Sequence, residues 1–138
     1  MEKVITIEEG RSYNFKASAF SPIAYNKLFP GRDFLRDMDA LRDAKDEMDG
    51  SGDYLTMETY EMFVRVAYTL AWQGFSKDPR PTQEQKEFRD TYPDPWDWID
   101  SFNMFSIYEI LPEILELWYI GSATNATSKK NRRKPSAK

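Results

Sequence analysis

The chain contains no cysteine and no histidine. The absence of cysteine excludes disulfides, a thiolate nucleophile and a thiolate metal site, and it is typical of proteins from reducing compartments. The absence of histidine removes the usual general base near neutral pH and the commonest metal ligand. We therefore expect a protein that is not an enzyme and that needs no cofactor.

Long apolar runs are also missing. No stretch reaches the roughly 18 consecutive apolar residues that a transmembrane helix needs, and Met1–Gly10 mixes polar and apolar residues unlike a signal peptide. We therefore expect a soluble, intracellular protein without a membrane partner. At 138 residues the chain is long enough for one domain and too short for two comfortable ones.

Charge is distributed unevenly along the chain. Residues 121–138 hold six of the 19 Lys and Arg residues and no acidic residue, which leaves 13 basic against 23 acidic residues in 1–120, a net charge of −10. An acidic body followed by a basic segment of low hydrophobicity predicts a folded domain over 1–120 and a disordered basic tail over 121–138.

Two short segments near the N-terminus, Val4–Ile7 and Ser12–Ala17, are rich in β-branched or aromatic residues. Gly10, in the connection between them, can take the positive φ that tight turns require. This pattern predicts a β-hairpin. Because an isolated hairpin is only marginally stable, we expect it to pack against the rest of the domain.

The remainder of the body has the spacing and start signals of helices. The start signals are Ser21-Pro22, Thr56, Thr82 with Gln85, Asp94-Pro95 and Ser106 with Glu109. The predicted helices cover residues 21–29, 32–48, 56–74, a short stretch after Thr82, 94–104 and 106–120. The sequence thus predicts a mainly α fold, a compact helical domain with a short N-terminal β-hairpin.

Residues 94–120 are expected to form the centre of the core, because they hold three of the four tryptophans. At helical spacing one face of this stretch collects Ile107, Ile110, Leu111, Ile114, Leu115 and Trp118. The helices at 32–48 and 56–74 have apolar faces of their own. We predict that these faces include Leu35 in the first helix and Met57 in the second.

Aromatic residues make up 15% of the chain, more than one core of this size easily buries. Exposed aromatic side chains are favoured anchors for partner proteins. Phe105 and Tyr108 do not fit the main apolar face of the last helix, and Trp118 ends it. We predict a partner-binding surface formed by Phe102, Phe105, Tyr108 and Trp118. For any single one of the four, packing in the core is the preferred interpretation.

The stretch from residue 47 to 58 offers a calcium site as an alternative function. Aligned with an EF-hand loop, it supplies side-chain oxygens from Glu47, Asp49, Ser51 and Glu58 and a glycine at the sixth position. The first position is Glu instead of Asp, the eighth is Tyr, and there is no second loop. A polar loop between two helices is the simpler interpretation.

The basic tail offers another alternative, a nucleic-acid-binding accessory protein. Six cationic residues would give salt-sensitive, sequence-independent affinity for phosphates. The tail has no aromatic residue to stack on bases, and the acidic body would repel a nucleic acid. A solubilising or linker role is therefore the preferred interpretation of residues 121–138.

Six segments, taken in order, form a pattern of hydrophobic positions and a few dipeptides over residues 3–120. They are Gly10–Ala19, Pro22–Tyr25, Leu28–Asp33, Ala67–Ala71, Pro95–Phe102 and Ile110–Trp118. This pattern resembles that of the tail assembly chaperones of long, non-contractile-tailed phages (siphophages) and prophages of Gram-positive bacteria. The segment at 76–93 is longer than in the family pattern.

This resemblance implies a chaperone that binds the tape measure protein, the long helical chain that fixes tail length, and keeps it soluble until tail-tube protein polymerises around it. It implies action in the host bacterial cytoplasm and absence from the mature virion. Such chaperones commonly have a longer product, made by a programmed frameshift, whose extension recruits tail-tube subunits. The basic tail lies where that extension would begin. Self-association through exposed aromatic residues is a further expectation.

Overall fold

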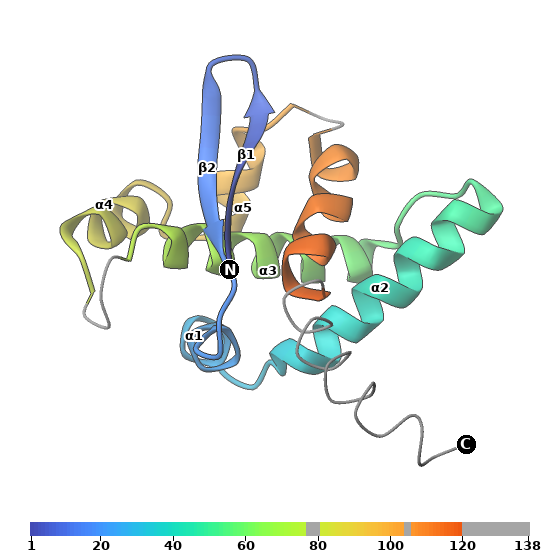
Figure 1. Ribbon diagram of the computed structural model, residues 1–138, viewed down its shortest axis with the longest axis horizontal. Coiled ribbons are helices and arrows are strands. Elements are labelled where there is room, and N and C mark those ends of the chain that lie inside the picture. The colour runs from blue at the N-terminus through green and yellow to red at the C-terminus, as the bar shows by residue number, and fades with distance from the viewer. Residues whose placement is uncertain (77–80, 104–105, 120–138) are drawn as a thin grey trace, which may run out of the picture.

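Helix α3 (Met57–Gly74) runs through the middle of the molecule (Figure 1). The computed structural model describes residues 1–76, 81–103 and 106–119. Helix α3 contacts strand β2 and the helices α1, α2, α4 and α5, whose bounds are given below. Its residues 66–71 are all buried, so every side of this part of the helix faces other elements. A helix that is buried all round forms the centre of a core.

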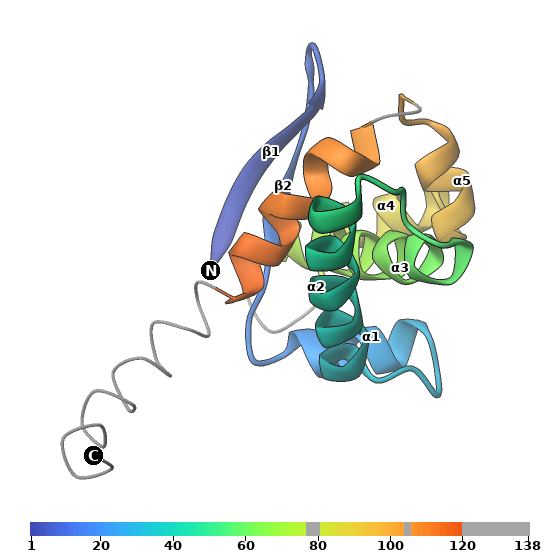
Figure 2. The same cartoon turned by 90° about the vertical axis from the view of Figure 1, so that its right-hand side faces the viewer.

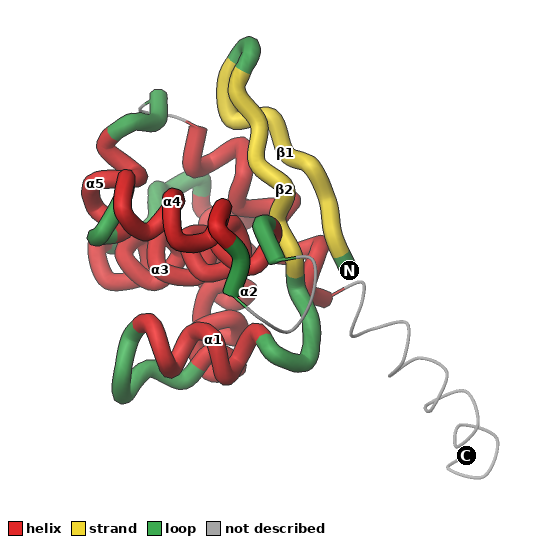
Figure 3. The backbone as a smooth tube through the Cα atoms, turned by 90° about the vertical axis from the view of Figure 1, so that its left-hand side faces the viewer, coloured by secondary structure: helices red, strands yellow, loops and turns green. Residues whose placement is uncertain are grey.

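The predicted hairpin is present as a two-stranded antiparallel sheet of β1 (Glu2–Glu8) and β2 (Arg11–Lys16). The turn places Gly10 at a φ of 78°. The hairpin stands along one side of the helices (Figure 3). Strand β2 packs on α3, with the Phe15 ring fully buried.

Helices α1 (Ser21–Leu28) and α2 (Phe34–Ser51) follow, joined by a short connection. The Asp33 carboxylate caps α2 by accepting a hydrogen bond of 3.2 Å from the backbone N–H of Arg36. Helix α2 ends at Gly52, which has a φ of 78° and so takes the left-handed conformation common at helix ends.

The next two helices begin at their predicted start signals. Helix α4 (Gln83–Thr91) has the full capping box of Thr82 and Gln85. Helix α5 (Pro95–Asp100) is capped by the Asp94 carboxylate, which accepts a hydrogen bond of 2.8 Å from the backbone N–H of Trp96. It is shorter than the predicted span of 94–104.

Residues 106–119 form the last helix, which lies between the hairpin and α2 (Figure 2). At its start, the Ser106 hydroxyl donates a hydrogen bond of 3.1 Å to the carbonyl of Ile7 in β1. At its end, the Tyr119 hydroxyl donates a hydrogen bond of 2.7 Å to the carboxylate of Asp39 in α2. The last helix therefore joins the first strand of the chain to α2.

The prediction of a mainly α fold with an N-terminal hairpin is confirmed. The predicted tail, residues 121–138, lies outside the described residues. Across residues 1–76, 81–103 and 106–119, no helix is both long enough and apolar enough to cross a membrane.

A buried polar cluster joins α1 to α2. The Tyr25 hydroxyl donates a hydrogen bond of 2.6 Å to Oδ2 of Asp37, and the Arg32 guanidinium donates to the same oxygen from 2.8 Å. Tyr25 is fully buried and Asp37 is 4% exposed. Burial, and then the bond to Asp37, raise the pKa of Tyr25 to about 12, because both disfavour the phenolate.

This shift predicts a loss of stability at high pH. The folded state holds the Tyr25 proton more tightly than the unfolded chain, whose tyrosines have a pKa near 10. The shift of about two pKa units corresponds to about 3 kcal/mol of stabilisation, which is complete below pH 10 and is lost as the pH rises through about 12. Urea denaturation over this range should show a smaller fall for Tyr25→Phe than for the natural chain. Equal falls would contradict the cluster.

Candidate functional site

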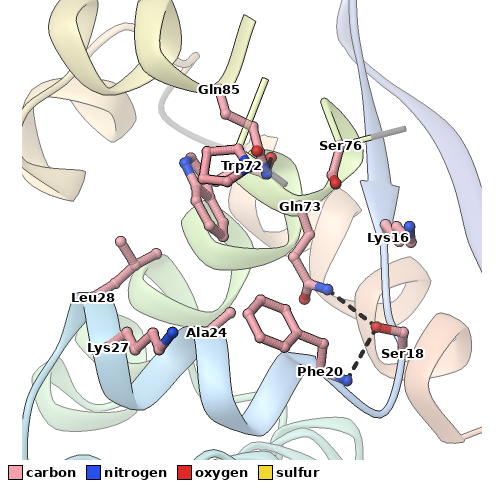
Figure 4. Close-up of a pocket in the computed structure, with 11 residues that line it drawn as sticks. Lys16, Ser18, Phe20, Ala24, Lys27, Leu28, Trp72, Gln73, Ser76 and Gln85 are labelled. Atoms are coloured by element: carbon pink, nitrogen blue, oxygen red, sulfur yellow. Dashed lines mark hydrogen bonds between the residues drawn. The ribbon is translucent and has the colours of Figure 1, made fainter. Parts of the chain in front are cut away.

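A groove of about 660 Å³ opens between α1 and the C-terminal end of α3 (Figure 4). Its apolar lining is formed by Phe20, Ala24, Leu28, Trp72 and Pro81. The remaining lining residues are polar or cationic, and they come from β2, the β2–α1 connection, α1, the end of α3 and the start of α4. A concave site with an apolar lining and a few polar groups has the composition of a binding site.

Two aromatic rings from different elements face this groove. Phe20 precedes α1, and Trp72 lies in the last turn of α3; Figure 4 shows both side chains turned toward the same space. Phe20 is 41% exposed and Trp72 is half-buried. Exposed aromatic surface of this kind is suited to bind an apolar group of another molecule.

Phe20 directly precedes α1 and has helical dihedral angles, with φ −80° and ψ −18°. Its serine neighbours make the side-chain hydrogen bonds at this helix start. The backbone N–H of Phe20 donates to Oγ of Ser18 at 3.2 Å, and the backbone N–H of Ser18 donates to Oγ of Ser21 at 2.9 Å. The start of α1 therefore does not use the phenylalanine side chain, which leaves the ring available for the groove.

A hydrogen-bond network fixes the wall between α1 and α3. The buried Ser21 hydroxyl donates to Oε1 of Gln73 at 2.6 Å, and Nε2 of Gln73 donates to Oγ of Ser18 at 3.1 Å. On the other side, Nε2 of Gln85 donates to the carbonyl of Trp72 at 3.1 Å. The side-chain amides of both glutamines are therefore engaged within the fold. They fix the residues before and in α1, and the start of α4, against the end of α3.

Two lysines line the groove, Lys16 at the end of β2 and Lys27 on α1. Nζ of Lys27 lies 5.8 Å from the centre of the Phe20 ring. No Asp or Glu is among the described residues that line the groove. This composition differs from that of residues 1–120 as a whole, which carry a net charge of −10.

Two of the four aromatic residues predicted to bind a partner pack against the core. The Phe102 ring meets Trp98 edge-on with ring centres 4.7 Å apart, and the Trp118 ring meets Phe34 in the same way at 4.9 Å. Both Phe102 and Trp118 are half-buried. Core packing, the interpretation preferred for each single residue, accounts for these contacts.

The other two predicted residues differ from this pair. Tyr108 is half-buried and its ring centre lies 5.2 Å from that of Tyr54, which is 69% exposed. Phe105 lies outside the described residues. No ring contact joins any two of Phe102, Tyr108 and Trp118 in the part of the chain that the structure describes. A common binding surface of these residues stays a prediction.

The loop that the calcium alternative requires is not formed. Glu47, Asp49 and Ser51 lie inside α2, and Glu58 lies in the first turn of α3. The carboxylate of Asp49 pairs with Lys45 at 2.5 Å. Alternate residues of a straight helix point to different sides, so they cannot surround one ion. Among the described residues, no group of three or more possible ligands is arranged to hold a metal.

Sequence reasoning missed the groove. Helical spacing places Trp72 on the apolar face of the predicted helix at 56–74. It does not show that other elements leave one side of this face uncovered. The local feature that could have pointed to this surface is Phe20, an aromatic residue directly before the Ser21-Pro22 start signal.

Comparison with known proteins identifies no relative. No protein-family model matches the chain, and no curated protein or solved structure is significantly similar to it. The resemblance to tail assembly chaperones therefore stays a prediction from the sequence.

Proposed function

We propose that this protein is a phage tail assembly chaperone that binds an apolar segment of the tape measure protein in the groove between α1 and α3. The observation that carries the proposal is the open apolar lining of this groove, with Phe20 and Trp72 turned into it. The sequence resemblance supplies the identity of the partner, and recruitment of tail-tube subunits is part of the same proposal.

The physical role follows from the surface properties of the chain. A long partner with exposed apolar helices aggregates unless another apolar surface covers them. A groove bounded by two aromatic rings provides such a surface, because large rings contribute much contact area at little cost in conformational freedom. The net charge of −10 on residues 1–120 would keep the complex soluble by repulsion between complexes.

The test is co-expression of the full chain with the tape measure protein encoded beside it, followed by affinity pull-down from the soluble fraction. The informative variant is Phe20→Ser, which removes the ring and places a small polar residue at the exposed position before α1. We expect little change in thermal stability, because Phe20 is 41% exposed, together with loss of most of the soluble partner, because the groove loses one of its two aromatic anchors.

The matched control is Ile23→Ser, on the same helix. Ile23 is 51% exposed and does not line the groove, so this variant should solubilise the partner as well as the natural chain does. The proposal fails if the partner is insoluble or unbound with the natural chain. The assignment to the groove fails if both serine variants behave alike.

The nucleic-acid alternative rests on the six Lys and Arg residues of 121–138. The same pull-down separates it from the chaperone proposal when these six residues are replaced with glutamine. A chaperone acting through the groove would still recover the tape measure protein. A protein acting through its tail would instead lose salt-sensitive binding to nucleic acid.

A further inference from the structure

Among the described residues of the groove, the charged groups are all of one sign. Lys16 and Lys27 line it, and no carboxylate does so among its described residues. Six other basic residues of residues 1–76, 81–103 and 106–119 form ion pairs with Asp or Glu: Lys3, Arg11, Arg32, Arg42, Lys45 and Arg65. The two groove lysines, like Arg36, Lys86 and Arg89, are not among these pairs, although acidic residues outnumber basic ones in the body of the chain.

The carboxylate across the sheet from Lys16 already has another partner. Glu2 stands opposite Lys16 in the hairpin register, yet its Oε1 accepts a hydrogen bond of 3.0 Å from the side-chain amide of Asn14. Lys27 is exposed, and its ammonium lies over the Phe20 ring. Both lysines are therefore available to an anion that enters from outside.

We infer that the groove binds an apolar peptide segment flanked by carboxylates, with the apolar side chains against Phe20 and Trp72 and the carboxylates against Lys16 and Lys27. This inference rests on the proposed function and specifies which segments of the partner are bound. Figure 4 shows the two lysines on separate sides of the groove, Lys16 at the end of β2 and Lys27 on α1. A segment with acidic residues on both sides of its apolar residues complements this arrangement.

The surrounding charge gives the two lysines a role in specificity. The net negative charge of residues 1–120 repels carboxylates in general, so within the body of the chain the two groove lysines favour binding of an acidic and apolar segment at the groove. A basic segment is attracted to the body in general but meets two like charges at the groove. Charge thereby selects both the kind of segment and the place where it binds.

The test uses three labelled synthetic peptides with the same helical Leu and Phe pattern, flanked by Glu, by Gln or by Lys, and measures binding to the full chain by fluorescence anisotropy. We expect the Glu peptide to bind about tenfold more tightly than the Gln peptide, from two partly exposed ion pairs. Added salt should reduce this difference. The Lys peptide should bind most weakly.

Variants assign the effect to the two lysines. In Lys16→Glu/Lys27→Glu the preference should reverse toward the Lys peptide, which a general loss of folding cannot produce. The matched control is Lys86→Glu, because Lys86 is exposed on α4 and does not line the groove. This control should keep the preference for the Glu peptide.

The outcomes separate this inference from the proposed function. If the three peptides bind equally, and Phe20→Ser weakens the binding of all three, the groove binds apolar segments without regard to charge. The inference is then wrong and the proposed function stands. Tighter binding of the Lys peptide to the natural chain also overturns the inference. If no peptide binds and the tape measure protein is not recovered in the pull-down, both are wrong.

Discussion

Replacing Gly74 with alanine is expected to lower the free energy of unfolding by about 3 kcal/mol, at the upper end of the range for overpacking. A Cβ atom at this position would lie 1.6 Å from the carbonyl oxygen of Asn14 and 2.6 Å from its carbonyl carbon. Both atoms belong to the backbone of β2, so no side-chain rotation can relieve the overlap. The strand must move away from α3.

The expected sign is opposite to the usual effect of this substitution. A glycine inside a helix is normally less favourable than alanine by about 0.5–1 kcal/mol. Gly50 provides the matched control, because it lies inside α2 and a Cβ added there would meet no neighbouring atom within 4 Å. Urea denaturation should therefore show Gly50→Ala as slightly more stable than the natural chain and Gly74→Ala as much less stable. Similar values for the two variants would contradict the close approach of β2 to α3.

Replacing Trp98 with alanine is expected to lower the free energy of unfolding by about 3–5 kcal/mol, the range found for large aromatic residues in cores. Trp98 is fully buried on α5. Its indole meets rings from β2, α3, α4 and the segment after α5, with centres 4.7–6.4 Å apart; the partners are Tyr13, Phe15, Tyr68, Phe88 and Phe102. Truncation would remove the contact that these elements share.

Two further variants test this interpretation. Trp96→Ala makes the same change two residues away. The Trp96 side chain is 40% exposed, and the centre of its ring lies 5.9 Å from the Arg65 guanidinium carbon. This variant should lower the free energy of unfolding by about 1 kcal/mol or less. Trp98→Phe should cost clearly less than Trp98→Ala, because it keeps a ring and removes an indole N–H that has no hydrogen-bond partner among the described residues. Equal losses of unfolding free energy for Trp96→Ala and Trp98→Ala, measured by urea denaturation, would contradict the orientation of α5, which buries Trp98 and leaves Trp96 partly exposed.

Local chemistry explains why much of the fold follows from the sequence. Thr56, Thr82 and Asp94 accept backbone N–H groups at helix starts, and these bonds form within a few residues of the capping side chain. Gly10 and Gly52 have positive φ at a turn and at a helix end for an equally local reason. Signals of this kind depend on neighbours along the chain, so helix starts and turns can be predicted without knowledge of the tertiary structure.

The exposure of individual residues depends on contacts between distant segments. Leu35 and Met57 fit apolar helix faces in the sequence, yet they are 51% and 71% exposed. Conversely, Leu117 is buried although it lies outside the predicted face of the last helix. Helical spacing defines which residues share a face, and only the packing of neighbouring elements decides how much of that face is covered.

The kinds and order of the elements, and the separation of an acidic body from a basic segment, can be read from the amino-acid sequence. Three features depend on the tertiary structure: α3 is central, α2 continues as far as Ser51, and Phe20, Trp72, Lys16 and Lys27 line one groove. These four residues span positions 16–72 and come from different elements. They meet because α1 and β2 both pack on α3, and packing between elements distant in sequence is not encoded in any local pattern.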